Sequence, residues 1–223
     1  MLNDGWLPLV SYIISGAGVT LALTLVSCGI GGTLSIVVAL MRGSEAWLVR
    51  SVATVYVEFF RSTSMYAQLF WAYFVLPQLG VDLTAFQAGA LAISLNTGAY
   101  GSEIVRGALN SVANSQKEAC TALNLRRFTS LTRVSFPQAL IAMLPSVSNL
   151  TIDVLKGTSI ASLIGISEIM FQADTVRIQT GNTAVSYLSV FVLYFVMTSL
   201  VAFLFDRLEQ KISAGWQGVS KAG

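Results

Sequence analysis

Residues 117–140 read KEACTALNLRRFTSLTRVSFPQAL, and this stretch decides how the fold is interpreted. It is polar and basic, with Lys117, Arg126, Arg127 and Arg133, and strongly apolar segments lie on both sides of it. Basic residues concentrate in the cytoplasmic loops of membrane proteins. The pattern therefore predicts a structured cytoplasmic loop over about 107–137, between two membrane-spanning helices.

The composition of the whole chain indicates an all-α integral membrane protein. Of its 223 residues, 54% are hydrophobic and 11% are charged, and the mean hydropathy is +0.70. A soluble domain usually carries about 25% charged residues. The chain has no histidine, which excludes an imidazole base, and its net charge of +2 gives no reason to expect a nucleic-acid partner. It also has no glycine-rich P-loop signature, so it is not expected to bind ATP itself.

Five apolar segments approach the length of about 20 residues that a membrane-spanning helix needs. We expect spans at about 11–41, 51–76, 85–106, 138–160 and 186–206. Most lysines and arginines then fall on one face of the membrane, which predicts an outside N-terminus and a cytoplasmic C-terminus. The residues of this face are Arg42, Arg50, Arg106, Lys117, Arg126, Arg127, Arg133, Arg207, Lys211 and Lys221.

The local pattern of the polar loop predicts two short cytoplasmic helices. Asn124 tolerates the left-handed conformation and can end the first helix. A second helix is expected over about 126–136, and Pro137 suits the first turn of the next span. The alternative is an amphipathic element that only binds lipid headgroups; it explains the basic residues but not the helix end. One face of the first helix carries Val112, Ala119, Cys120 and Leu123.

In this loop the chain resembles the permeases of ABC importers. Their cytoplasmic loop has Glu-Ala-Ala, then a glycine, then Ile-x-Leu-Pro. This chain has Glu118-Ala119-Cys120, then Asn124, then nine residues, then Val134-Ser135-Phe136-Pro137. The resemblance implies a type I importer fold, with coupling helices between spans three and four that dock into a cleft of an ATPase subunit. The ATPase-coupling residues that it implies are Glu118, Ala119, Cys120, Asn124, Leu125 and Pro137.

The resemblance extends over nearly the whole chain and looks like the subfamily that imports polar amino acids and opines. That subfamily usually has an acidic residue where this chain has Gly157, and often a glutamate where it has Leu150. Both differences remove negative charge near the expected translocation path, which argues against a cationic amino acid as the solute. The supporting stretches are GVTLALTLVS (18–27), YVEFFRSTSMYAQLFWAYFVLP (56–77), ISLNTGAYGSEIVRGALNSV (93–112) and LKGTSIASLIGISEI (155–169).

Charged side chains inside the expected spans have two interpretations. Glu58 and Arg61 are three residues apart, as are Asp153 and Lys156, so each pair could form a structural ion pair. Alternatively, these groups line the substrate path, where basic groups would meet a carboxylate and Asp153 an ammonium group. The candidate path residues are Arg61, Thr63, Asn96, Asp153, Lys156, Thr158 and Ser159.

The resemblance further implies a transport subunit with no catalytic residue, metal site or cofactor of its own. ATP and magnesium would be bound by two separate ATPase chains. The other implied partners are a second copy or a sister permease, an extracytoplasmic solute-binding protein and membrane lipid, in a bacterial inner membrane. Two other functions are weighed against this one. A self-sufficient secondary transporter usually has internal repeats, and a membrane enzyme needs clustered acid–base or metal residues; neither pattern is found.

Overall fold

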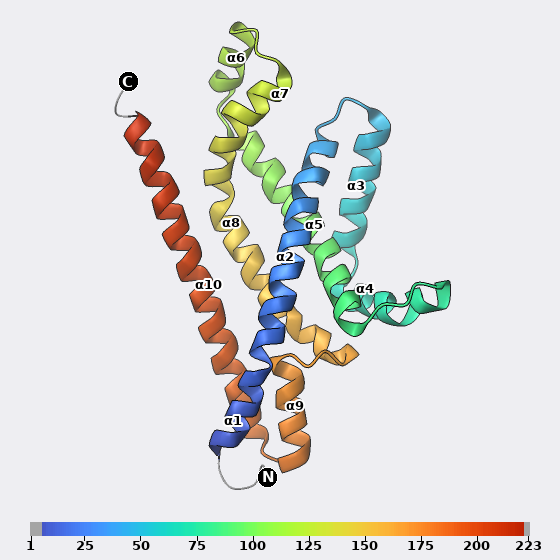
Figure 1. The fold of residues 1–223 in the computed structure, drawn as a ribbon. Helices are drawn as coiled ribbons and strands as arrows, with labels where there is room; N and C mark the ends of the chain where they lie inside the picture. The colour runs from blue at the N-terminus through green and yellow to red at the C-terminus, as the bar shows by residue number, and fades with distance from the viewer. Residues whose placement is uncertain (1–5, 221–223) are drawn as a thin grey trace.

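A computed structural model describes residues 6–220, which are helical throughout apart from short connections (Figure 1). The all-α prediction is confirmed for this part of the chain. The segments are α1 (Trp6–Ser15), α2 (Ala17–Arg42), α3 (Trp47–Ser62), α4 (Met65–Phe70), η1 (Trp71–Val75), η2 (Leu76–Leu79), α5 (Ala85–Ser111), α6 (Asn114–Ala122), α7 (Arg127–Ser130), η3 (Leu131–Ser135), α8 (Phe136–Gly157), η4 (Thr158–Ile164), α9 (Ile169–Thr180) and α10 (Thr183–Ser220).

The two ends of the helical bundle differ in their sequence content. Figure 1 shows the α2–α3 connection, the α6–α7 segment and the C-terminal part of α10 at one end, and the start of α1 together with α9 at the other. The segments that carry the basic residues therefore share one end of the molecule, as the sequence predicts. Lys221, which belongs to the same set, lies outside the described residues.

The first expected span is bent at Gly16, where α1 gives way to α2. A Cβ at this position would lie 2.6 Å from the carbonyl carbon of Glu168. Only glycine permits this approach, because any side chain would collide with the backbone of the connection that leads into α9. The bend thus brings the N-terminal helix against the α9 end of the molecule.

The centre of the bundle is a close contact between α2 and α5. The small residues Ala90, Ser94, Gly98 and Ser102, which recur every four positions on α5, are all buried. A Cβ at Gly98 would lie 2.8 Å from Leu34 Cδ2 on α2. Small side chains allow two helix backbones to approach this closely. The stripe therefore forms the surface by which α5 packs against α2.

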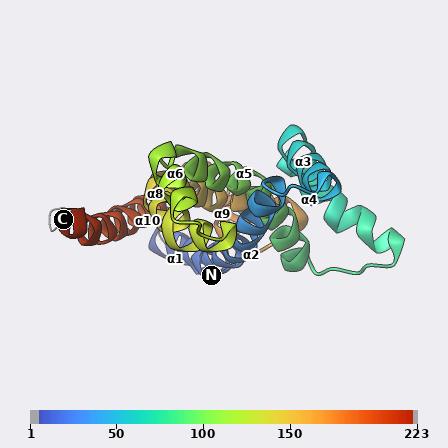
Figure 2. The same cartoon turned by 90° about the horizontal axis from the view of Figure 1, so that it is seen from above.

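The second expected span, 51–76, is not one helix. α3 ends at Ser62, and Thr63 and Ser64 have extended backbones with ψ of 149° and 131°. The Thr63 hydroxyl donates to the Phe59 carbonyl at 2.8 Å, a local bond of the kind that competes with a helical backbone. The chain then resumes as α4, and Figure 2 shows α4 and the turns after it projecting from the bundle beside α3.

Three segments are long and apolar enough to cross a membrane: Trp6–Arg42, Arg127–Ile164 and Thr183–Ser213. They correspond to the first, fourth and fifth expected spans. α10 lies along the outside of the bundle (Figure 1), and Leu188 and Phe191 on this helix are exposed. An exposed apolar helix face is typical of a helix in contact with lipid or with another membrane helix.

Candidate coupling and transport site

The first helix of the polar loop ends at a left-handed asparagine. Asn124, two residues beyond α6, has a φ of 51°. Its amide donates to the Thr121 carbonyl at 2.9 Å, and the Leu125 amide donates to the Cys120 carbonyl at 3.0 Å. These two bonds make a Schellman motif, which satisfies the last carbonyl groups of the helix. The helix end that we predict at Asn124 is confirmed.

The second helix of the polar loop is present, but it is not separate from the helix that follows. α7 continues through the π-helical turn η3 into α8. Pro137 has no amide hydrogen, and its ring would clash with the carbonyl group four residues earlier in a regular α-helix. The wider π turn accommodates this residue, which is why the expected break before the next span is absent.

The residues expected to couple to an ATPase are mostly exposed, and only Cys120 among them is buried. Glu118 and Ala119 are exposed, whereas Cys120 is only 6% exposed. Cys120 and Leu125 line a cleft of about 1040 Å³ between the polar loop and the α2–α3 connection. The exposed pair is available to a soluble partner, and the buried Cys120 side chain packs the loop against the rest of the chain.

Arg127 of α7 joins the two sides of this cleft. Its guanidinium forms an ion pair with Glu45 and donates a hydrogen bond to the Gly43 carbonyl at 3.1 Å. Both partners belong to the short connection between α2 and α3. The sequence identifies Arg127 only as one of several basic loop residues, because nothing local indicates this distant partner.

Two of the candidate path residues meet at the break after α3. The Gln68 amide donates to the Thr63 hydroxyl at 2.7 Å and to the Phe60 carbonyl at 3.0 Å. The Asn96 amide, from α5, donates to the same Phe60 carbonyl at 3.1 Å and to the Gln68 side-chain oxygen at 3.3 Å. Thr63 and Asn96 therefore satisfy the backbone groups that the break exposes. Gln68, which links them, was not among the expected residues.

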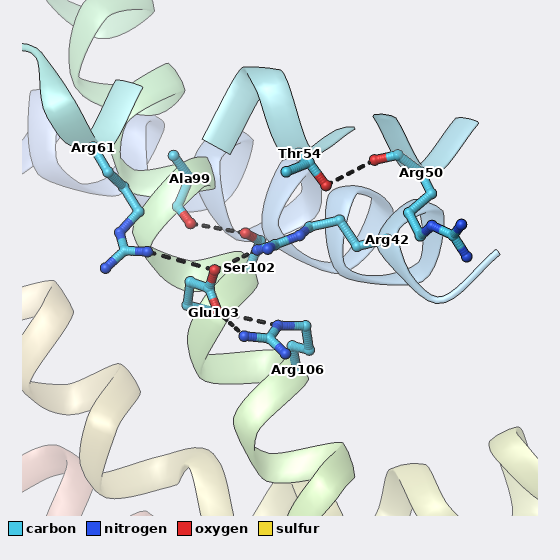
Figure 3. Close-up of polar contacts among 8 residues, drawn as sticks. All are labelled: Arg42, Arg50, Thr54, Arg61, Ala99, Ser102, Glu103 and Arg106. Carbon is cyan, nitrogen blue, oxygen red and sulfur yellow. Dashed lines mark hydrogen bonds and ion pairs between the residues drawn. The ribbon is translucent and has the colours of Figure 1, made fainter. Parts of the chain in front are cut away.

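Arg61 is paired with a different carboxylate from the one expected. Its partner is Glu103 of α5, at 3.5 Å, rather than Glu58. Glu103 also forms an ion pair with Arg42 and accepts two hydrogen bonds from Arg106, at 2.7 and 3.1 Å (Figure 3). Three guanidinium groups from three helices thus converge on one carboxylate.

The candidate residues at the end of α8 differ in their exposure to solvent. Asp153 and Lys156 are exposed, and in the described structure no ion pair joins them. Thr158 is completely buried, whereas the Ser159 hydroxyl is partly exposed and donates to the Lys156 carbonyl at 2.8 Å. The structural ion pair considered for Asp153 and Lys156 is therefore not found.

A carboxyl group that the sequence places in the loop between the fourth and fifth expected spans is buried and joins α2, α9 and α10. Glu168 is completely buried and accepts hydrogen bonds from the Tyr194 hydroxyl at 2.7 Å and the Phe171 amide at 2.9 Å. Thr20 is 3.5 Å from the same carboxyl group, and Thr158 is 3.5 Å from the Tyr194 oxygen. Glu168 lies outside the expected spans, and burial raises the pKa of its carboxyl group.

The side chains of the site are mainly guanidinium, carboxylate, amide and hydroxyl groups. Such groups bind polar solutes through hydrogen bonds and ion pairs. Among residues 6–220, no group of three or more His, Cys, Asp or Glu side chains could hold a metal ion. Cys28 and Cys120 are free thiols on α2 and α6.

The long apolar helices and the folded basic loop at one end define a membrane component of a transport system. The family model described as "Binding-protein-dependent transport system inner membrane component" matches residues 31–214. The chain belongs to this family.

Individual relatives are similar over almost their whole length. The chain is 39% identical to "Probable amino-acid ABC transporter permease protein y4tF" of Sinorhizobium fredii, over 97% of this chain and 93% of that protein. It is 31% identical to the "Glutamine transport system permease protein GlnP" of Escherichia coli K12, over 92% of this chain and 94% of that protein. These relatives are permeases of amino-acid transport systems.

Solved structures have the same fold. A chain in the crystal structure of an amino acid ABC transporter with histidines superposes with a TM-score of 0.86 and 32% identity, covering 94% of this chain and 99% of that chain. A chain of the inward-facing MetNI methionine ABC transporter superposes with a TM-score of 0.77 and 19% identity, covering 92% of this chain and 98% of that chain. The second likeness shows the fold alone.

Proposed function

We propose that this chain is the permease subunit of an ATP-driven importer for a polar amino acid or a related zwitterionic solute. The observation that carries the proposal is the folded polar loop, with its left-handed end at Asn124, in a chain of this family. The names of the y4tF and GlnP relatives support an amino acid as the solute. This chain would form part of the solute path and change its conformation during transport. A separate chain would hydrolyse ATP.

The proposed topology has five spans in a single domain of residues 1–223, in a bacterial inner membrane. Besides the three long apolar segments, α3 and α5 would cross the membrane, with the N-terminus outside and the C-terminus in the cytoplasm. α5 has 27 residues and at about 1.5 Å per residue is long enough to do so. α3 has 16 residues, which at the same rise is about 24 Å and somewhat shorter than a span of about 30 Å.

The coupling loop would dock on one of two ATPase subunits, which bind ATP and magnesium. Glu118 and Ala119 are exposed and would contact the ATPase directly. Asn124, through its left-handed backbone, sets the angle between the two loop helices. Cys120, Leu125 and Pro137 would hold the loop to the spans. The assembly would also contain a second copy or a sister permease, a solute-binding protein on the outer face and surrounding lipid.

The solute would pass along the polar and charged side chains that lie within the membrane-spanning segments. Charged side chains within spans usually face a partner or an aqueous path. Arg61 and Lys156 suit the solute carboxylate, and Asp153 suits its ammonium group. Closure of the ATPase pair would move the coupling loops and change which side of the membrane the path faces. Thr63, Asn96, Thr158 and Ser159 would shape this path.

Affinity purification of the chain from its native membranes, with mass spectrometry of the co-purifying proteins, tests the proposal. The comparison is between the wild type and Glu118→Lys, which reverses an exposed charge of the loop. We expect a P-loop ATPase to accompany the wild type and to be lost from the variant. A chain that purifies without an ATPase in both cases, and that moves solute in proteoliposomes without ATP, would instead be a secondary transporter.

A further inference from the structure

The connection between α2 and α3 is fixed on two sides by charged contacts. On one side, Arg127 of the coupling loop forms an ion pair with Glu45 and a 3.1 Å hydrogen bond to the Gly43 carbonyl. On the other side, Arg42, the residue before Gly43, forms an ion pair with Glu103 of α5. Arg127 of the coupling loop therefore contacts the connection just before α3 begins at Trp47.

The far end of α3 is attached to the same carboxylate of α5. Arg61, near the last residue of α3, lies 3.5 Å from Glu103 (Figure 3). Between its ends α3 is a continuous helix of 16 residues, and its buried face includes Ala53 and Val57. A helix with this packing moves as one body, so a displacement at its first turn reaches its last turn.

α3 is followed by two residues with an extended backbone. Thr63 and Ser64 separate α3 from α4, and Gln68 and Asn96 bond the exposed backbone groups there. Hinges are usually a few residues at the ends of helices that absorb a change in backbone angles. A movement of α3 would therefore appear as a change at this break, beside the proposed path.

We propose that Arg127 is a positioning residue for transport, which passes movement of the coupling loop through Glu45 to α3 and to the break at Thr63 and Ser64. This inference rests on the proposed function, because only an ATPase would move the loop. It adds a second route from the loop to the spans, beside the direct continuation of α7 into α8.

A cleft of about 1040 Å³ lies between the two segments that Arg127 connects. It separates the coupling loop from the α2–α3 connection, and Leu40, Leu125 and Phe128 are among its lining residues. Arg127 lies at the same cleft and bonds both Glu45 and Gly43 of the opposite side. The planar fork of arginine suits two acceptors at once, so a lysine would not replace it fully.

The Arg127–Glu45 ion pair would contribute to coupling rather than to the stability of the fold. The side chains of Arg127 and Glu45 are 71% and 86% exposed, and an ion pair this exposed adds little to the free energy of unfolding. If Arg127 acts in coupling, its loss should change transport without unfolding the protein. The amount of solute moved for each ATP hydrolysed would change, while the protein still folds.

The experiment uses the complete transporter, purified with its ATPase and binding protein and placed in proteoliposomes. Uptake of a mixture of radiolabelled amino acids and release of phosphate are measured together. We expect Arg127→Gln and Glu45→Gln each to lower uptake per ATP by about two- to fivefold, and the double variant to lose no more than the larger single loss. Exchange of the two residues, Arg127→Glu with Glu45→Arg, restores at least half of the ratio.

Arg177→Gln is the matched control. The Arg177 side chain is 38% exposed and, like Arg127, is paired with a carboxylate, Asp174 at 3.1 Å, but it lies on α9 at the opposite end of the molecule. Loss of this charge is expected to leave uptake per ATP unchanged. Glu45→Gln keeps the test valid if Arg127→Gln does not assemble, because it removes the same ion pair from the other partner.

Three results would overturn the inference. Uptake per ATP could equal the wild-type value in both single variants. Uptake and hydrolysis could fall together, which would make Arg127 a structural or docking residue. The losses of the single variants could also add in the double variant. If the wild-type complex shows no ATP-driven uptake of any amino acid, the proposed function itself is contradicted and this inference with it.

Discussion

Arg42, the last residue of α2, forms an ion pair with Glu103 of α5, and Arg61 and Arg106 approach the same carboxylate (Figure 3). One acidic group thus serves three basic groups from three helices. The side chains of Arg42 and Glu103 are only 14% and 21% exposed, so water compensates little of the charge. The arrangement depends on Glu103, because its loss would leave three guanidinium groups close together without a counter-charge.

Glu103→Gln is expected to destabilise the protein strongly. The neutral amide can still accept hydrogen bonds, but it no longer offsets the positive charges. We expect a loss of about 2–3 kcal/mol in the free energy of unfolding, which is in the range for charged hydrogen bonds and somewhat below that for fully buried pairs. Thermal unfolding in detergent, at low and at high salt, measures it, and the loss should be smaller at high salt.

Glu58→Gln is the matched control for that substitution. Glu58 is exposed on α3, and within the described residues it forms no ion pair. We expect a change within about 0.5 kcal/mol, as for most surface substitutions. Equal losses for both variants would show that any carboxylate in this region contributes as much, and that the convergence on Glu103 has no special role.

Asn124→Gly should be tolerated, and Asn124→Val should not. The φ of 51° at this position is accessible to glycine and asparagine but costs a β-branched residue about 1–2 kcal/mol. We expect the valine variant to lower both thermal stability and the amount of co-purifying ATPase, since the second loop helix would leave at a different angle. Equal ATPase recovery from the valine and glycine variants would contradict this role.

The helix end at Asn124 was predictable because its cause is local. A residue that tolerates positive φ ends a helical pattern wherever the rest of the chain lies. The small-residue stripe of α5 was predictable for a similar reason, since Ala90, Ser94, Gly98 and Ser102 recur at the helical period. In both cases the signal and its consequence lie within one segment.

The pairs of Arg42 and Arg61 with Glu103, and of Arg127 with Glu45, were not predictable, because the partners lie far apart in the sequence. The three-residue spacing favoured a pair between Arg61 and Glu58, but packing of α3 on α5 gives Arg61 the carboxylate of Glu103 instead. The burial of Glu168 was hidden for the same reason: the residue caps α9, and distant residues enclose it, among them Gly16, Thr20 and Tyr194. Contacts of this kind are set by tertiary packing rather than by local spacing.

Gly101→Ala should be destabilising, because a side chain at this position of α5 has no free space. A Cβ at Gly101 would collide with the Ser35 hydroxyl on α2. We expect a loss of about 1–3 kcal/mol from this overpacking, measured by thermal unfolding. Gly107→Ala is the control on the same helix, where a Cβ would meet nothing within 4 Å. There the better helix former should add about 0.5–1 kcal/mol, and a loss at Gly107 would show that α5 does not tolerate side chains generally.

Glu168→Gln should change how stability depends on pH. Burial raises the pKa of the Glu168 carboxyl group above its ordinary value of 4.5, and the hydrogen bonds from Tyr194, Phe171 and Thr20 offset this only in part. The folded state therefore binds a proton more tightly than the unfolded state does. The stability that this proton contributes is fully present below a pH of about 4.5 and is lost as the pH rises through the raised pKa.

The variant has no proton to exchange at this position, so the melting temperature of the wild type should rise relative to that of Glu168→Gln as the pH is lowered from about 7.5 to about 5. Asp174→Asn is the control for loss of an acidic group on the same helix, α9, where the Asp174 side chain is 37% exposed. Its difference from the wild type should shift less over the same range. A constant difference between the wild type and Glu168→Gln would mean that Glu168 keeps the same charge in the folded and unfolded states.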